Sequence, residues 1–134
     1  MSVFLGWMPD ENARRELGIL RDGLRDALPA GVVRHQWRTP AQWHATLRYL
    51  GEDVDDVLLD AVRAMMPALA GTHAACDVVV EQAQYWPGAR VLVAALSTPT
   101  PLRQLHADLE HAMRELGFGP EKRALKPHVT LAHL

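Results

Sequence analysis

Two short segments of this chain repeat one pattern of chemically active residues. His44-Ala45-Thr46-Leu47 and His128-Val129-Thr130-Leu131 both have the form His-x-Thr-Leu. Chance supplies two such tetrapeptides in a chain of this composition only about one time in a thousand. The repetition therefore indicates a shared role for the two segments.

Both segments have the composition of strands. On a strand, residues i and i+2 point to the same face, about 6–7 Å apart. His44 and Thr46 then share one face, and His128 and Thr130 share one face of the other strand. Each segment thus presents an imidazole and a hydroxyl, with apolar residues behind them. Two such strands side by side would bring two imidazoles and two hydroxyls to one small anion.

That set of groups suits the cleavage of a phosphoester without a metal ion. A neutral histidine accepts a proton from the attacking water, and a protonated histidine donates one to the leaving alkoxide. Imidazole suits both tasks because its unperturbed pKa lies near 6.5, as a rough reference value. The hydroxyls can donate hydrogen bonds to the phosphoryl oxygens, where negative charge accumulates in the transition state.

Basic residues surround both segments, although the formal net charge is -2. They are Arg34, Arg38 and Arg48 around the first segment, and Lys122, Arg123 and Lys126 before the second. Such cations are most often solvated surface, and we expect Arg38 and Lys126 before the others to touch a ligand. Strict alternation places Arg48 on the face of His44 and turns Tyr49 toward the core. Trp86 is expected in the core or at its rim, where an aromatic ring could also stack on a nucleobase.

Strand patterns alternate with three amphipathic helices along the chain. We expect strands over 2–8, 32–38, 43–50, 76–85, 89–97 and 128–134. Apolar residues spaced by three or four predict helices with stripes from Ala13 to Ala27, from Val54 to Met65 and from Leu102 to Leu116. The expected caps are Asp10 and Asp53, and the third helix is expected to start at Thr98 or Thr100. The expected stops are Pro29 with Gly31, Pro67 with Gly71, and Gly117. This order favours an α+β fold over a helical bundle.

The composition excludes several classes of protein. A chain of 134 residues with 49% hydrophobic residues is the size of one domain. Its net charge argues against binding to nucleic acid by a bulk positive field. Its one cysteine, Cys76, cannot form an internal disulfide, and no apolar run approaches the roughly 20 residues of a membrane helix. A cytoplasmic protein without a metal site or a phosphate-loop motif is expected.

The chain resembles a known family over nearly its whole length. The segment 37–52 reads WRTPAQWHATLRYLGE, and the segment 126–132 reads KPHVTLA. Together they are similar to the two signatures of the 2H phosphoesterase superfamily. Within it, the chain resembles the RNA 2',3'-cyclic phosphodiesterases, also called 2'-5' RNA ligases (LigT-like).

The resemblance implies a bilobal α+β fold. Two lobes related by a pseudo-twofold axis would place antiparallel sheets on either side of a central cleft, with the helices outside. Residues 1–134 would form a single LigT-like domain that lacks the C-terminal strands of the family. Family members often have Arg three residues after the second Thr, where this chain has His133.

The resemblance also implies a reaction, the hydrolysis of a terminal 2',3'-cyclic phosphate on RNA to a 2'-phosphate. His44 and His128 would be the acid–base pair, and Thr46 and Thr130 would hold the phosphate. We expect His128 to activate water and His44 to protonate the leaving 3' oxygen, with the opposite assignment left open. Further expected substrate contacts are Arg38, Lys126 and His133. No cofactor and no obligate protein partner are implied, and 2'-5' ligation is a side activity of the family.

Two alternative functions stay open at this point. The same chemistry could act on 2'-5' oligonucleotides or on other small cyclic phosphates. From another class, the chain could be a non-catalytic module that binds RNA ends.

Overall fold

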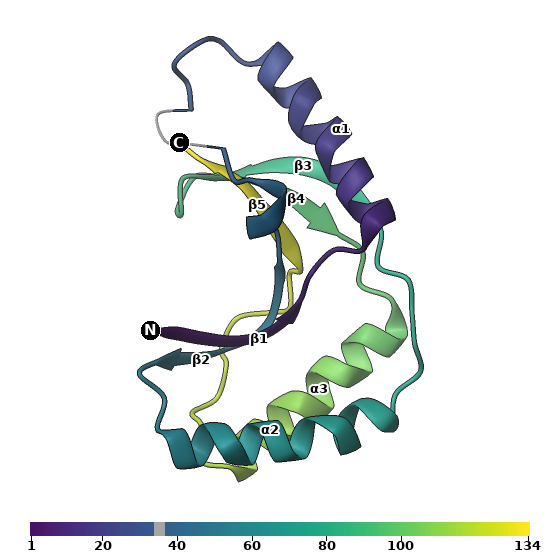
Figure 1. The fold of residues 1–134 in the computed structure, drawn as a ribbon, viewed down its shortest axis with the longest axis vertical. Helices are drawn as coiled ribbons and strands as arrows, with labels where there is room; N and C mark the ends of the chain where they lie inside the picture. Colours follow the sequence, from purple (N-terminus) through teal and green to yellow (C-terminus); the bar gives the residue numbers. More distant parts are fainter. Residues whose placement is uncertain (34–36) are drawn as a thin grey trace. The chain divides into compact units, whose positions relative to one another are not determined.

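Strands and helices alternate along the chain, as the hydropathy pattern predicts (Figure 1). The computed structural model describes residues 1–33 and 37–134. Its elements are β1 (Ser2–Trp7), α1 (Glu11–Ala27), β2 (Ala45–Glu52), α2 (Asp56–Gly71), β3 (Val80–Trp86), β4 (Val91–Leu96), α3 (Thr100–Glu115) and β5 (His128–His133), with a short 3-10 helix at Pro40–Gln42. The predicted α+β class is confirmed.

The strands are hydrogen-bonded in the order β1-β2-β5-β4-β3. Antiparallel ladders join β2 to β5, β5 to β4 and β4 to β3. The chain divides into two compact units. The first unit holds Met1–Gly6, Thr46–Asp77 and Thr98–Leu125, and the second unit holds Trp7–Ala45, Val78–Ser97 and Lys126–Leu134.

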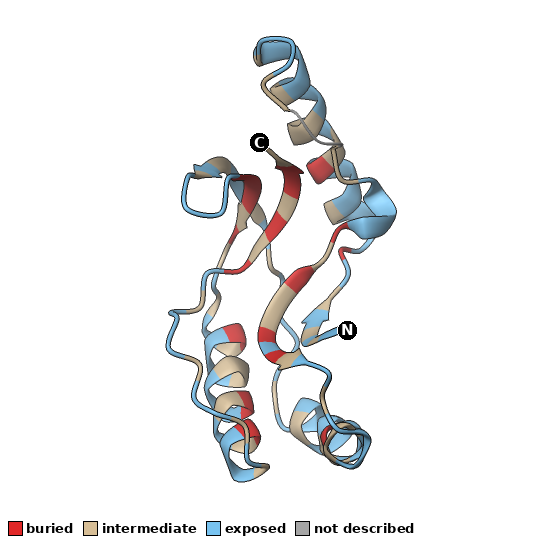
Figure 2. Cartoon of the chain, turned by 90° about the vertical axis from the view of Figure 1, so that its left-hand side faces the viewer, coloured by how far each residue is buried: buried red, intermediate tan, exposed pale blue. Residues whose placement is uncertain are grey.

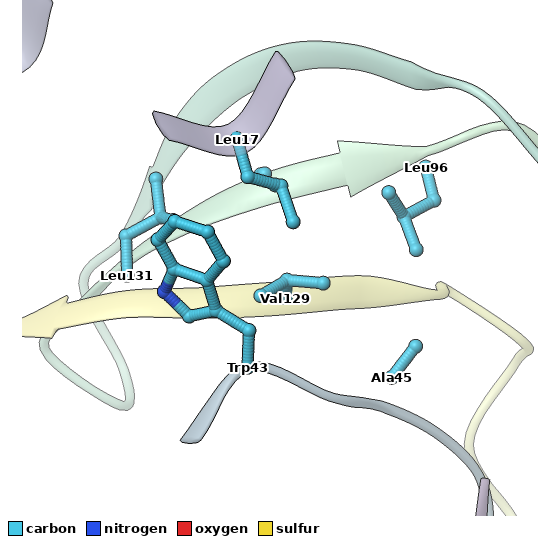
Figure 3. Packing of buried hydrophobic residues seen from close by; sticks show 7 residues of the cluster. Leu17, Trp43, Ala45, Leu96, Val129 and Leu131 are labelled. Carbon is cyan, nitrogen blue, oxygen red and sulfur yellow. The ribbon is translucent and has the colours of Figure 1, made fainter. Parts of the chain in front are cut away.

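In the second unit, α1 covers one face of the strands. The Asp10 side chain caps the helix by accepting a hydrogen bond from the Ala13 N–H at 2.8 Å, as predicted. Leu17 of α1 is fully buried among side chains from β2, β4 and β5 (Figure 3). The cluster consists of Leu17, Trp43, Ala45, Ala94, Leu96, Val129 and Leu131. Helix α1 thus hides the apolar face of these strands.

In the first unit, α2 and α3 pack on apolar residues of β1 and β2 around Val62 and Met113. The buried residues of α3 lie on one side of the helix (Figure 2). The predicted cap Asp53 is wrong, because Asp55 caps α2 by accepting from the N–H groups of two residues of its first turn. Of the two predicted stops, Pro67 is wrong because it lies inside α2, and Gly71 is confirmed as the last residue of the helix.

One further expectation, that of a strand before the first His-x-Thr segment, differs from the structure. The predicted strand at 32–38 is not formed in its described part, where Trp37 makes only an isolated bridge to Ala132. Its other residues 34–36, which include the cation Arg34, lie outside the described residues. The third helix begins at Thr100 as one of the two alternatives predicted, although its cap Pro99 makes no side-chain hydrogen bond.

The burial of Arg48 and Tyr49 is the reverse of the prediction. Arg48 is buried with 6% of its surface exposed, whereas Tyr49 is exposed. The strict alternation fails in β2 because Leu47 and Leu50, three residues apart, both pack on the cluster beneath α2 and α3. Arg48 is therefore neither a solvated cation nor a residue available for a ligand.

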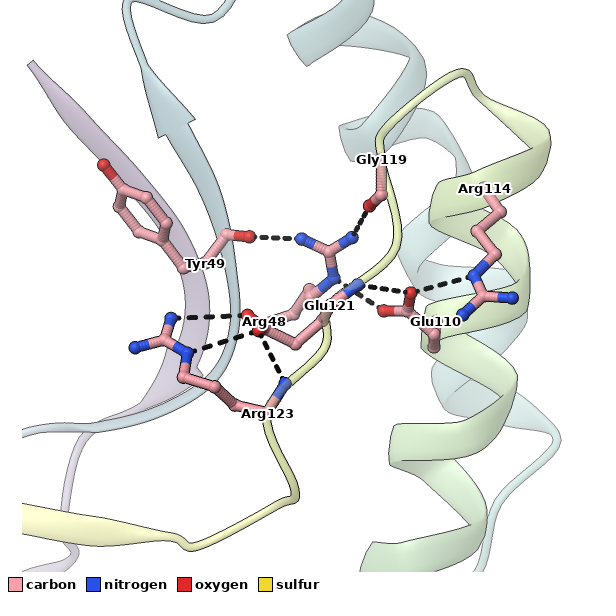
Figure 4. A network of polar contacts seen from close by, with 7 residues as sticks. All are labelled: Arg48, Tyr49, Glu110, Arg114, Gly119, Glu121 and Arg123. Atoms are coloured by element: carbon pink, nitrogen blue, oxygen red, sulfur yellow. Dashed lines mark hydrogen bonds and ion pairs between the residues drawn. The ribbon is translucent and has the colours of Figure 1, made fainter.

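A network of polar contacts holds Arg48 in the first unit (Figure 4). Its Nε donates to Glu110 Oε2 on α3 at 2.7 Å, and its Nη2 donates to the Gly119 carbonyl at 2.5 Å. Glu110 Oε1 also accepts from Arg114 and from the Glu121 N–H. Burial alone would raise the pKa of Glu110, but these hydrogen bonds outweigh it and hold that pKa below its ordinary value. The network ties the loop after α3 to β2.

His73 forms a second polar link in the first unit, between the end of α2 and α3. Its Nδ1–H donates to the Leu69 carbonyl and its Nε2–H to Asp108 Oδ2, each at 2.8 Å. Since both acceptors lack a proton to give, both ring nitrogens must carry one. The Leu69 carbonyl above all raises the pKa of His73, and Asp108 adds to this effect against the opposing effect of burial.

The stability that His73 contributes should therefore fall as the pH rises. A raised pKa in the folded state stabilises the fold fully below the unfolded value of about 6.5, and this contribution is lost as the pH passes through the folded value. We expect the difference in urea-unfolding midpoint between wild type and His73→Gln to shrink from pH 6 to pH 8, as an approximate window. The exposed control His111→Gln should differ little from wild type throughout. A difference for His73→Gln that is independent of pH would contradict this interpretation.

Candidate active site

The second unit has a polar face on the side of the strands opposite to α1. Val129 and Leu131 of β5 are buried in the cluster beneath α1. His128 and Thr130 alternate with them and are half-buried. His44 precedes Ala45, which is also buried in that cluster. Alternation therefore directs His44, His128 and Thr130 away from α1.

The ladder between β2 and β5 brings the two tetrapeptides together. Ala45 of the first is the Cα partner of Val129 of the second. Continuing this antiparallel register by one residue places His44 opposite Thr130. An imidazole from one tetrapeptide and a hydroxyl from the other thus neighbour each other within the second unit. His44 itself precedes the strand, which begins at Ala45 rather than at residue 43 as expected.

Both histidines are held by the main chain in the same way. The Nδ1 atom of His44 lies 2.9 Å from the Gln42 carbonyl, and that of His128 lies 2.7 Å from the Lys126 carbonyl. Each acceptor is the carbonyl two residues earlier. A carbonyl oxygen only accepts, so Nδ1 carries the hydrogen in both rings. The Nε2 atom is then the ring nitrogen left to accept or donate a proton, depending on the charge of the ring.

Trp86 of β3 contacts His128 on this face. The centroids of the two rings are 4.3 Å apart, and the ring planes are inclined by 57°. The indole Nε1–H donates to Gln84 Oε1 at 2.9 Å. The His128 ring is thus held at its edge by a main-chain carbonyl and at its side by an anchored indole. The sequence indicates only that Trp86 lies in the core or at its rim, and it does not single out Gln84. The signal that could have linked them is their spacing of two residues along β3, which places both side chains on one face.

Arg38 and His133 meet further along β5. Arg38 Nη2 lies 2.9 Å from His133 Nε2 in a partly buried contact. A shift in register of the β4–β5 ladder after Thr130 leaves Leu131 and Ala132 both fully buried, although they are consecutive. This bulge returns His133 to the face of Thr130.

Most of the predicted site residues share this polar face or its edge in the second unit: His44, His128, Thr130 and His133, with Arg38 beside the last. Lys126 is exposed just before β5, and it contributes its carbonyl to His128. Thr46 follows Ala45 on β2 and belongs to the first unit. Arg123, a cation near the second tetrapeptide, also belongs to the first unit and is bound to Glu121.

Two other features are absent from residues 1–33 and 37–134. No group of three or more His, Cys, Asp or Glu side chains that could hold a metal ion occurs among them. In that described part, no helix is both long enough and apolar enough to cross a membrane.

Comparison with known proteins agrees with this architecture. Residues 8–134 match the family described as the 2'-5' RNA ligase superfamily. The crystal structure of TT0787 of Thermus thermophilus is similar with a TM-score of 0.81 and 25% identity, over 99% of this chain and 74% of that chain. That of E. coli LigT complexed with 3'-AMP is similar with a TM-score of 0.73 and 21% identity, over 97% and 71%. No curated protein matches the chain.

The protein thus has the α+β fold of LigT-like 2H phosphoesterases, as predicted. More particularly, the chain belongs to the 2'-5' RNA ligase superfamily, which matches all but its first seven residues. The members of this superfamily are enzymes that act on phosphodiester bonds of RNA and nucleotides.

Proposed function

We propose that the protein is an RNA 2',3'-cyclic phosphodiesterase of the cytoplasm. The observation that carries the proposal is the matched pair of imidazoles: His44 and His128 each have Nδ1 bound to the carbonyl two residues earlier, which leaves Nε2 for proton transfer to and from a substrate. The pairing of Ala45 with Val129 supports a common site for the two rings. Membership of the 2'-5' RNA ligase superfamily supports the substrate class.

The proposed reaction opens the cyclic phosphate at its 3' oxygen. His128 Nε2 takes a proton from a water molecule whose oxygen attacks phosphorus. The bond from phosphorus to O3' breaks, and protonated His44 gives its Nε2 proton to that oxygen. The product is a 2'-phosphate, and the two histidines end with their protonation states exchanged.

Hydroxyl groups complete the proposed site. The Thr130 hydroxyl can donate a hydrogen bond to a non-bridging phosphoryl oxygen and so stabilise its charge in the transition state. We assign the same role to Thr46, and we assign substrate contacts to Arg38, Lys126 and His133. Proton transfer by two imidazoles requires no metal ion or other cofactor, and ligation through a 2'-5' linkage would be the reverse type of reaction.

The test is phosphorus NMR of adenosine 2',3'-cyclic phosphate incubated with the protein and a chelator. We expect a single product signal, that of the 2'-phosphate. A 3'-phosphate product, or a need for added metal, would contradict the proposed mechanism. If a 2'-5' dinucleotide is turned over faster in a competition assay, the 2'-5' linkage rather than the cyclic phosphate is the substrate. Binding of a 2'-phosphorylated end without any turnover would instead indicate a binding module.

A further inference from the structure

Arg38 is a cation that is oriented without being neutralised. A guanidinium donates and cannot accept, so His133 Nε2 must accept the hydrogen bond from Arg38 Nη2, which leaves that imidazole uncharged in this contact. Among residues 1–33 and 37–134, no carboxylate lies within ion-pair distance of Arg38. By contrast, Arg48 is bound to Glu110 and Arg123 to Glu121. Within the described residues, the positive charge of Arg38 is therefore not balanced by a carboxylate.

The backbone fixes where this charge lies. The Arg38 N–H donates to the Leu131 carbonyl at 2.8 Å, and the preceding residue bridges to Ala132. His133 is the Cα partner of Val91, whereas Thr130 is the partner of Val93. At about 3.3 Å per residue, His133 lies up to roughly 10 Å along β5 from Thr130. The Arg38–His133 pair therefore marks a position further along β5 than Thr130, on the side away from His128.

We propose that Arg38, positioned by His133, binds the phosphodiester next to the terminal cyclic phosphate of an RNA strand. This inference rests on the proposed function, because it takes Thr130 and the two catalytic histidines as the site of the terminal phosphate. His133 engages one of the five N–H donors of the guanidinium, and the others suit the oxygens of a phosphate. A strand carries one phosphate per nucleotide, so the preferred substrate is an oligonucleotide of two or more nucleotides rather than a cyclic mononucleotide.

Calorimetry with a matched pair of ligands tests the proposal without requiring turnover. Both ligands are dinucleotides ending in a 2'-phosphate; one has an ordinary internal phosphodiester, and the other has an uncharged methylphosphonate in its place. We expect the wild-type protein to bind the charged ligand about 10-fold more tightly. Arg38→Gln should bind both alike, and its salt-dependence slope for the charged ligand should fall by about 0.7.

A control variant and the pattern of weakening locate the contact. Arg63→Gln, which removes an exposed arginine of α2, should keep the wild-type preference. Equal weakening of both ligands by Arg38→Gln would overturn the proposal, because Arg38 would then act at the terminal phosphate. Equal binding of both ligands by the wild type would also overturn it, even if the protein opens cyclic mononucleotides. If the wild type prefers the charged ligand and Arg38→Gln does not, the subsite is supported whether or not the protein hydrolyses a cyclic phosphate. Absence of hydrolysis would then contradict only the proposed function.

Discussion

Replacement of His128 by alanine is expected to lower kcat/KM for a 2',3'-cyclic phosphate by about 10²–10⁴-fold. His44→Ala should cause a loss of the same order. Each substitution removes one of the two Nε2 atoms that the main chain orients through Nδ1, and water cannot replace a positioned imidazole at the same rate. Initial rates with a cyclic mononucleotide, measured in the presence of chelator, give both values.

The double variant and a control make this test specific. If the two imidazoles act as one acid–base pair, the double variant should be barely slower than either single variant, because the losses are not additive. His111→Ala removes an exposed imidazole on α3 that pairs with Glu115, and it should keep the wild-type rate. Retention of wild-type turnover by either His44→Ala or His128→Ala would remove that residue from the proposed mechanism.

The helices were predictable because their signals are local. Asp10 lies directly before the apolar stripe of α1, and its side chain caps that helix. The cap of α2 was misplaced by two residues, because Asp53, Asp55 and Asp56 compete within one short segment. Asp53 instead has a positive φ of 52° and accepts a hydrogen bond from the N-terminal amine. A choice among neighbouring acids depends on backbone angles that composition does not carry.

The error at Arg48 has a long-range cause. Its carboxylate partner, Glu110, is 62 residues away on another helix. Alternation within β2 could not anticipate a buried ion pair that recruits residues from α3 and the loop after it. The consequence for function is direct: Arg48, next to the first His-x-Thr segment, is structural, whereas Arg38 contacts the His133 imidazole instead of a carboxylate.

The sequence indicated which residues to consider for the candidate site, but it did not indicate the contacts around them. The repeat of His and Thr is visible in the sequence, and the pairing of Ala45 with Val129 places the two repeats on neighbouring strands. The contact of Trp86 with His128 depends on the registers of two ladders, β3 with β4 and β4 with β5. The position of His133 depends on a bulge, for which the sequence has no glycine or other marker.

Trp43→Ala is expected to have the largest effect on stability, a loss of about 3–5 kcal/mol in the free energy of unfolding. Trp43 is 1% exposed and lies at the centre of the cluster beneath α1, together with Leu17 and Val129 (Figure 3). The Arg21 guanidinium of α1 also lies 5.4 Å from the ring centroid. Alanine would leave a cavity and remove the packing and the cation–π contact. Urea unfolding measures the loss, and Ile19→Ala on the exposed side of α1 is the control.

Trp43→Phe separates the packing of the ring from its polar atom. The indole Nε1 is buried and has no hydrogen-bond partner among the described residues. A buried donor without a partner costs about 1–3 kcal/mol, so its removal should offset much of the volume lost on shortening to Phe. We therefore expect Trp43→Phe to be destabilised far less than Trp43→Ala. Equal losses in the two variants would contradict the expected offset from removing an unsatisfied N–H. A loss below about 1 kcal/mol in Trp43→Ala would show that α1 does not bury this ring. The packing of Trp43 could then not explain how the neighbouring residue His44 is oriented.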